Sequence, residues 1–423
     1  MKRVSKNVCI AALFCVATAV AMHAQTFTSL VSFDYSDGSL PPGALVQGAD
    51  GNFYGVAQIG GKNLNGTAFS MTPSGVLTTL YNFCSQKNQA LCIDGSYPNA
   101  PLVQGANGNF YGTSRFAGEA LNAGTVFELS SAGDFTLLYS FCSGPGCPDG
   151  EYPEGGLIRG ADGNFYGNTS NGGSHSMGGD GGTIFKITPA GTHTALYNFC
   201  ARVSNGVCLD GMSPEATLLQ ATDGNFYGTT LFGGAHNKGT FFKLTPDGKF
   251  TSLHSLSEAS FTNALIEGAD GNLYGTTEAG GKLASGTVFR ITPSGQLATL
   301  YNFCSLPNCG DGKFPVAGLV QGSDGNFYGT TILGGINNDS SCRGGPGCGT
   351  IFQITPAGKL TTLYNFCSQT NCPDGSQPDA ALIQAGDGTF YGTTSEGGST
   401  ACNGGCGTVF SLSMEAQSRE RSK

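Results

Sequence analysis

A six-residue motif that recurs seven times restricts what this chain can fold into more than any other feature. It first occurs as Asp50–Gly55 (DGNFYG), and closely similar copies begin at Asn107, Asp162, Asp223, Asp270, Asp324 and Asp387. Successive copies start 47 to 63 residues apart. A repeat of about 50 residues with strand-like content is typical of the blades of a β-propeller.

Each copy predicts four short strands. In the second copy the expected strands are Pro101–Gly105, Asn109–Ser114, Gly124–Leu129 and Phe135–Phe141. These segments are rich in Val, Thr, Phe, Tyr and Leu, which suit a pleated, packed surface. An Asp-Gly or Asn-Gly pair separates the first two strands, and turns such as Thr72–Gly75 (TPSG) separate the last two, so both connections should be tight.

The two ends of the chain complement each other. The last copy stops after its third expected strand, Gly407–Leu412, whereas Thr26–Phe33 (TFTSLVSF) matches the fourth-strand pattern of Leu77–Phe83 (LTTLYNF). We therefore predict an all-β fold, a single seven-bladed β-propeller of four-stranded antiparallel blades over residues 25–413, followed by a polar tail at 414–423. The N-terminal strand would complete the last blade and close the ring, whereas an open solenoid would leave unmatched strands at its ends.

Residues 1–24 have the pattern of a secretory signal peptide. Lys2, Arg3 and Lys6 precede the apolar run Val8–Ala21, and Ala21 and Ala24 are the candidate cleavage positions. The run is shorter than the roughly 20 residues of a membrane-spanning helix. We expect a cleaved signal, no membrane span in the mature chain, and a secreted, periplasmic or cell-surface protein.

The cysteines form close sequential pairs. Fourteen of the 16 lie beyond the signal segment, as Cys84/Cys92, Cys142/Cys147, Cys200/Cys208, Cys304/Cys309, Cys342/Cys348, Cys367/Cys372 and Cys402/Cys406. The even count, the local spacing and the export signal predict seven short-range disulfides. Metal binding is the alternative, but zinc sites use closely spaced pairs that converge with a second pair or with histidines. No histidine adjoins a pair.

The net charge of the chain limits which classes of macromolecule it can bind. The net charge is −9, with 20 Lys and Arg against 29 Asp and Glu, and removal of the basic signal segment makes it more negative. This balance argues against nucleic acid and anionic lipid as partners.

Propeller topology divides the loops between two faces. The turns between first and second strands and between third and fourth strands share one face, here the turn face. The long second-to-third loops, the blade connections and every expected disulfide share the other, here the loop face. Braced loops on a rigid scaffold favour a binding site. The candidate ligand-binding residues on the loop face are His175, Asp180, His236, Asp339 and Arg343.

The repeat pattern D-G-N-F-Y-G-T-T-x-x-G-G … G-T-[VI]-F-x-[IL]-T-P-x-G resembles the GloVer tandem-repeat proteins, also called choice-of-anchor repeat proteins. The resemblance covers residues 26–413 and implies an exported or surface bacterial β-propeller of uncharacterised activity. Many relatives carry a C-terminal anchoring segment, whereas Ser413–Lys423 is polar. We therefore expect free secretion or periplasmic residence. The D-G-N-[FL]-[YW] hairpin is also similar to that of streptogramin lyases, which have Trp where this chain has Tyr.

The repeated polar and aromatic residues have structural interpretations. We interpret Asp-Gly-Asn as a hairpin turn and the seven Tyr of the motif as packing between blades. Further Asp-Gly pairs in the blade connections, at Asp37, Asp94, Asp149, Asp210, Asp311 and Asp374, are interpreted as turns. Calcium binding there is the alternative, although no Asp-x-Asp-x-Asp-Gly run occurs. We assign no catalytic residue and no cofactor beyond this option of calcium.

Three functions are compatible with these features. The leading hypothesis is an exported, non-catalytic binding module that recognises a glycan or a protein on the loop face. The alternatives are an extracytoplasmic lyase or glycoside hydrolase that uses the same face, and a structural envelope protein. Convergent carboxylates or a perturbed histidine near the mouth of the central channel would favour the enzyme.

Overall fold

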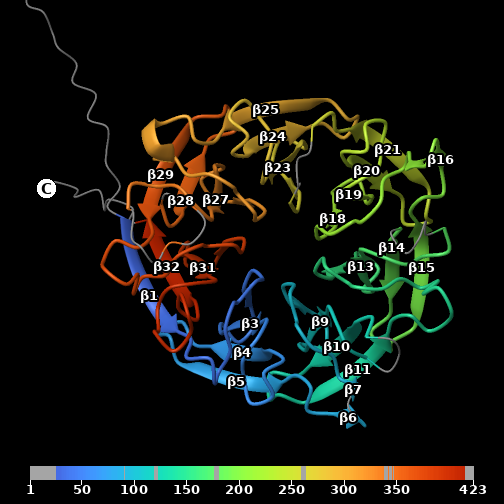
Figure 1. Ribbon diagram of the computed structural model, residues 1–423, viewed down its shortest axis with the longest axis horizontal. Coiled ribbons are helices and arrows are strands. Elements are labelled where there is room, and N and C mark those ends of the chain that lie inside the picture. The colour runs from blue at the N-terminus through green and yellow to red at the C-terminus, as the bar shows by residue number, and fades with distance from the viewer. Residues whose placement is uncertain are drawn as a thin grey trace, which may run out of the picture.

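The computed structural model describes residues 25–414 except 90, 119–121, 176–180, 259–262, 338–341, 343–344 and 346. Seven four-stranded antiparallel sheets form a closed ring, which confirms the seven-bladed β-propeller (Figure 1). The predicted signal peptide and most of the polar tail lie outside the described residues. None of the described segments forms a helix of the length and apolarity that crossing a membrane requires.

Four concentric layers of strands build the ring. The innermost strands are β2 (Val46–Gln47), β8 (Val103–Gln104), β12 (Ile158–Arg159), β18 (Leu219–Gln220), β22 (Ile266–Glu267), β26 (Val320–Gln321) and β30 (Ile383–Gln384). The second strands are β3 (Phe53–Ala57), β9 (Phe110–Ser114), β13 (Phe165–Thr169), β19 (Phe226–Thr230), β23 (Leu273–Thr277), β27 (Phe327–Thr331) and β31 (Phe390–Thr394).

The two outer layers follow in the same order. The third strands are β4 (Thr67–Met71), β10 (Thr125–Leu129), β14 (Thr183–Ile187), β20 (Thr240–Leu244), β24 (Thr287–Ile291), β28 (Thr350–Ile354) and β32 (Thr408–Met414). The outermost are β5 (Leu77–Asn82), β11 (Phe135–Ser140), β15 (His193–Asn198), β21 (Phe250–Ser255), β25 (Leu297–Asn302), β29 (Leu360–Asn365) and β1 (Gln25–Ser32). Blades are numbered 1 to 7 from the blade of β2.

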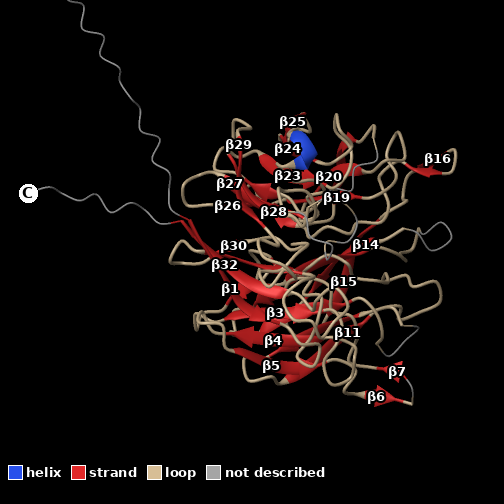
Figure 2. Ribbon diagram, turned by 60° about the vertical axis from the view of Figure 1, so that its left-hand side comes forward, coloured by secondary structure: helices blue, strands red, loops and turns tan. Residues whose placement is uncertain are grey.

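Two small hairpins and one short turn complete the described elements. The hairpins are β6 (Lys87–Asn88) with β7 (Leu91–Cys92), and β16 (Val203–Ser204) with β17 (Val207–Cys208), and a 3-10 turn spans Pro307–Cys309. Figure 2 shows β6, β7 and β16 projecting from the same side of the ring. Both hairpins lie in blade connections, so this side is the loop face.

The N-terminal strand closes the ring as predicted. β1 pairs antiparallel with β32, with Phe27 opposite Leu412. The Phe27 ring stacks on Tyr364 of blade 6, with the ring centroids 3.8 Å apart. The first and last parts of the chain therefore share one sheet, and that sheet packs against its neighbour as the other blades do.

Burial on both faces explains the near-continuous apolar strands. All five residues of each second strand are buried. The motif tyrosines pack between blades, as predicted: Tyr54 stacks on Phe110 at 3.9 Å, and Tyr391 contacts Phe53 at 4.1 Å across the ring closure. The Tyr54 hydroxyl donates a hydrogen bond to Asp50 of the hairpin turn (2.8 Å). The motif therefore packs neighbouring blades together and stabilises the hairpin turn.

The blade connections are braced by buried aspartates. Asp210 accepts hydrogen bonds from the Tyr197 hydroxyl (2.6 Å) and from the Ala201 N–H (3.1 Å). Equivalent tyrosine–aspartate bonds occur at Asp94, Asp149, Asp311 and Asp374. These carboxylates contribute to the fold by fixing the chain as it leaves one blade for the next.

All seven predicted disulfides are present, with the predicted partners. Five lie in blade connections, and two, Cys342–Cys348 and Cys402–Cys406, lie in second-to-third loops. The loop face is therefore covalently braced around most of the ring.

Candidate functional site: the acidic channel mouth

A cavity of about 300 Å³ opens at the centre of the loop face. Residues from all seven blades line it, and most of them directly precede an innermost strand. We call this region the channel mouth. Its charged lining residues are Glu154, Glu215, Glu278 and Asp379. The blade connections therefore bring together carboxylates that lie far apart in the sequence.

An ion pair between blades 2 and 3 borders the mouth, and its Glu154 partner lines the cavity. Arg115, directly after β9, places its Nε 2.6 Å from the Glu154 Oε1, and the Glu154 side chain is only 15% exposed. Asn99 donates a hydrogen bond from Nδ2 to the other carboxylate oxygen of Glu154 (2.6 Å). The buried Oδ1 of Asn99 has no protein partner among the described residues.

Glu215 of blade 4 has the most distinctive electrostatic environment of this group. Loss of solvent and then the Glu154 charge raise its pKa to about 7, while Arg115 opposes the shift. The Glu215 side chain nevertheless keeps an exposed surface at the mouth. A carboxyl group that is accessible and titrates near neutrality can donate or accept a proton there.

The other two carboxyl groups also favour the neutral form. Burial raises the pKa of Glu278, and burial raises the pKa of Asp379 to about 7. The Asp379 Oδ1 is buried without a protein partner among the described residues. Nearby like charges and poor solvation explain why the mouth resists full ionisation.

Partly exposed aromatic rings adjoin the ion pair. Phe116 packs edge-to-face on Tyr97 and on Tyr152, with ring centroids 5.6 Å apart in both pairs. All three side chains are half-buried, and the Arg115 guanidinium lies 4.9 Å from the Phe116 ring centroid. Neither Arg115 nor these three rings line the cavity, so this apolar ring surface lies beside the mouth, next to the ion pair.

The described carboxylates of the mouth do not form a cluster of three that could share one metal ion. Among the residues that the structure describes, no three Asp, Glu or His side chains bring their ligand atoms within 4.8 Å of one another without a cysteine. The arrangement suits an extended polar ligand or proton transfer.

The five ligand-binding residues predicted from the sequence do not line the channel mouth or are not among the described residues. His175 and His236 are exposed on the loops of blades 3 and 4, and neither lines the cavity of the mouth. Asp180, Asp339 and Arg343 fall outside the described residues. A ligand-binding role for these five residues stays a prediction.

Sequence reasoning missed the residues of the mouth, although the repeats hold a signal for them. Three positions before the first-strand leucine, the seven copies have Pro42, Asn99, Glu154, Glu215, Thr262, Val316 and Asp379. The surrounding residues repeat, whereas this position varies from copy to copy. Variation at one register of a repeat indicates a surface position that the propeller fold does not constrain.

A model of the Gloeobacter/Verrucomicrobia repeat matches residues 16–208 and 180–342. The chain belongs to this family. Membership in the Gloeobacter/Verrucomicrobia repeat family confirms the resemblance found in the repeat motif. No curated protein matches the chain.

Solved structures resemble this Gloeobacter/Verrucomicrobia repeat protein in fold alone. A streptogramin B lyase has a TM-score of 0.57 at 16% identity, covering 92% of this chain and 98% of the lyase. A catalytically inactive His-to-Ala variant of virginiamycin B lyase from Staphylococcus aureus with quinupristin has a TM-score of 0.57 at 15% identity, covering 93% and 100%. In the described part of this chain no histidine lines the channel mouth.

Proposed function

We propose that this protein is an extracytoplasmic binding protein that recognises a glycan at the acidic channel mouth. The observation that carries the proposal is the Asn99–Glu154–Arg115 cluster beside the partly exposed rings of Phe116 and Tyr152. Carboxylate, amide and guanidinium groups exchange hydrogen bonds with sugar hydroxyls, while aromatic faces cover the apolar faces of sugar rings.

Compartment and charge support a neutral or cationic glycan. Seven disulfides are typical of proteins outside the cytoplasm. The net charge of −9 and the four acidic side chains of the mouth disfavour polyanionic polymers. The ligand class that fits best is an uncharged or amino-bearing polysaccharide of the cell surroundings.

A glycan and cell-wall polysaccharide array tests this proposal. The oxidised mature protein should bind a restricted set of glycans, and Glu154→Gln should weaken binding at least about tenfold because a charge-assisted hydrogen bond is lost. Asp134→Asn is the control, since it removes one exposed carboxylate from the turn between β10 and β11 on the opposite face. Binding that Glu154→Gln leaves unchanged would place recognition elsewhere, and no binding at all would redirect the search to protein partners.

A second candidate function, a lyase or glycoside hydrolase, is favoured by one specific observation. Glu215 has a pKa of about 7, and its neighbour Glu154 forms an ion pair with Arg115. Acid–base enzymes use such neighbouring carboxyl groups in different protonation states. By the criterion of convergent carboxylates, the channel mouth supports this alternative, and the streptogramin and virginiamycin lyases have a similar ring.

Turnover separates the two functions. Each glycan that binds should be incubated with wild-type protein and with Glu215→Gln, and the products assayed for new reducing ends and for unsaturated sugars. Products that disappear in Glu215→Gln while binding persists would establish the enzyme. Binding without products in the wild type would establish the binding protein.

A further inference from the structure

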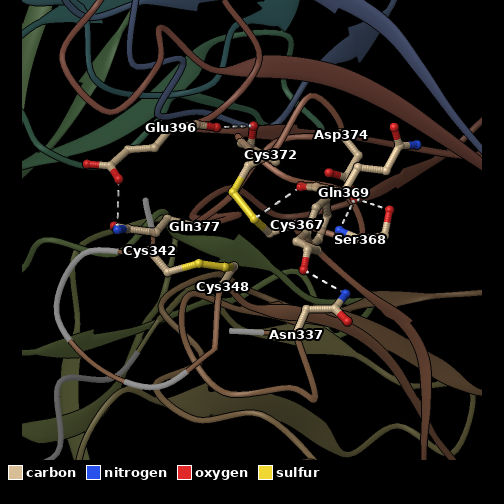
Figure 3. The surroundings of a disulfide bond; sticks show 12 residues. Asn337, Cys342, Cys348, Cys367, Ser368, Gln369, Cys372, Asp374, Gln377 and Glu396 are labelled. Carbon is tan, nitrogen blue, oxygen red and sulfur yellow. Dashed lines mark hydrogen bonds between the residues drawn. A yellow bond between two sulfur atoms is a disulfide. The ribbon is translucent and has the colours of Figure 1, made fainter. Parts of the chain in front are cut away.

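Two disulfides from different loops meet between blades 6 and 7. Cys342–Cys348 belongs to the loop between β27 and β28, and Cys367–Cys372 belongs to the connection from β29 to β30. Figure 3 shows the two bonds side by side. The Sγ atoms of all four cysteines lie within 4.8 Å of one another. None of the four lines the cavity of the channel mouth.

Hydrogen bonds hold these loops together independently of the disulfides. The Gln377 N–H donates to the Cys348 carbonyl (2.9 Å), which ties the connection to the loop. Asn337 donates from Nδ2 to the carbonyls of Asn365 (2.8 Å) and Phe366 (3.0 Å), which ties the loop to the end of β29. Cys348, Cys367 and Cys372 are buried and Cys342 is half-buried. The four sulfurs should therefore stay close when the S–S bonds open.

Four sulfur atoms that lie within 4.8 Å of one another are close enough to share one metal ion once both disulfides are open. Zinc binds thiolate sulfur at about 2.3 Å, which places the sulfurs of a four-cysteine site about 3.8 Å apart. Each bonded pair of sulfurs would have to separate by roughly 2 Å after its disulfide opens, a change that rotation of the cysteine side chains can supply. Among the described residues, this is the one place where four cysteine sulfurs converge. The other cluster of possible metal ligands that contains cysteine consists of Cys142, Cys147 and Glu151.

We propose that Cys342, Cys348, Cys367 and Cys372 form a redox-controlled site for one thiophilic divalent ion of the zinc class. The oxidised chain holds two disulfides, and the reduced chain binds the ion through four thiolates. Opening both disulfides takes four electrons and four protons, which two molecules of a dithiol reductant supply as each closes to a cyclic disulfide. Ion binding then releases the four thiol protons.

Cobalt titration tests the reduced state. The purified protein is reduced with a dithiol without denaturant, freed of reductant under nitrogen and titrated with Co²⁺, with circular dichroism to monitor the fold. We expect the intense visible absorption of tetrahedral cobalt thiolate to saturate at one ion per chain and to vanish on addition of Zn²⁺. The double variant Cys342→Ser/Cys348→Ser should lose this band, whereas the matched variant Cys84→Ser/Cys92→Ser should keep it. A band that survives the first variant, or that both variants abolish, would overturn the proposal.

A second experiment needs no reduction and covers the case in which the reduced chain unfolds. Cys342→Ser/Cys372→Ser leaves Cys348 and Cys367, which should form a new disulfide in the folded, oxidised protein, as non-reducing peptide mapping would show. The control Cys304→Ser/Cys372→Ser leaves Cys309 and Cys367 in separate blade connections, and these should stay free thiols. Free thiols at Cys348 and Cys367 would contradict the convergence on which the proposal depends.

Discussion

Partial desolvation and the nearby Glu154 charge raise the pKa of the Glu215 carboxyl group to about 7, although part of its side chain is exposed. In the unfolded chain it would titrate near its ordinary value of 4.5. Between these two pH values the folded protein binds more protons than the unfolded one, so the free energy of unfolding falls as pH rises. Below about pH 4.5 the Glu215 carboxyl group is neutral in the folded and the unfolded protein, so it does not lower the free energy of unfolding.

Substitution of Glu215 therefore has a pH-dependent effect on stability. Glu215→Gln should match the wild type at pH 4.5 and exceed it at pH 8, by about 1 kcal/mol once solvent screening at this exposed group is allowed for. Denaturant titrations at several pH values would measure the difference. Parallel stability curves for the two proteins would show that Glu215 titrates normally.

Gly112 illustrates how tightly the second strands pack. A Cβ at this position would lie 2.6 Å from the Phe127 ring and 2.7 Å from Leu102. We expect Gly112→Ala to lower the free energy of unfolding by about 1–3 kcal/mol through overpacking. Gly144→Ala is the matched control, because its Cβ would have no neighbour closer than 3.8 Å. Guanidinium denaturation would compare the two, and equal midpoints would disprove the packing argument.

Individual contacts of the channel mouth could not be predicted from the chain alone. Arg115 and Glu154 are separated by 39 positions in the sequence and meet because blades 2 and 3 are neighbours. Motif reasoning finds residues that repeat, whereas Glu154, Glu215 and Asp379 lie at a register where the copies differ. His175 and His236 have side chains suited to ligand binding, but both are exposed on loops and neither lines the cavity.

At the scale of elements, the repeat predicted which segments form strands more accurately than it predicted where the strands begin and end. The second, third and fourth strands of blade 2 are within one residue of prediction, but the first is Val103–Gln104 instead of Pro101–Gly105. Pro101 has no N–H to donate to a ladder, and the Gly105 N–H closes the hairpin turn to Asn109 (2.8 Å). A bulge between Val126 and Phe127, repeated between the outer strands of the other blades, also left no signal in the pattern.

The connection between blades 3 and 4 depends on the Tyr197–Asp210 hydrogen bond. Asp210 is fully buried, so loss of its hydroxyl donor leaves a charge less well compensated. Tyr197→Phe should cost about 1–3 kcal/mol of unfolding free energy. Tyr35→Phe removes a hydroxyl from a side chain that is 37% exposed and should change stability by less than about 0.5 kcal/mol. Thermal and chemical unfolding would measure both, and similar values for the two variants would contradict the bracing role.

At the scale of the whole molecule, the ring was predictable because the chain ends are complementary. The C-terminal copy ends with a third strand that lacks a fourth, and the N-terminus supplies a fourth strand that lacks a third. Pairing β1 with β32 satisfies both. Disulfide partners were equally predictable, since each pair closes a loop of at most eight residues. The convergence of Cys342–Cys348 with Cys367–Cys372 was not, because blade geometry alone brings the two loops together.

Closure by β1 also predicts how the ring would open. Without residues 25–32, β32 would become an outer strand with unpaired backbone groups, and Tyr364 would lose the Phe27 ring stacked on it. Exposed edges of this kind recruit other strands. The truncated protein should therefore unfold at a lower temperature than the mature chain and self-associate, as sedimentation would show.

A synthetic peptide of residues 25–32 should reverse both effects by occupying the vacated edge. The same peptide with Phe27→Ala is the matched control and should bind at least about tenfold more weakly, because it lacks the ring that packs on Tyr364 and Phe410. Equal binding of the two peptides would mean that backbone pairing alone closes the ring. If the truncated protein stays monomeric and its melting temperature is unchanged, the packing of blades 1 and 7 closes the ring and β1 is not needed for closure.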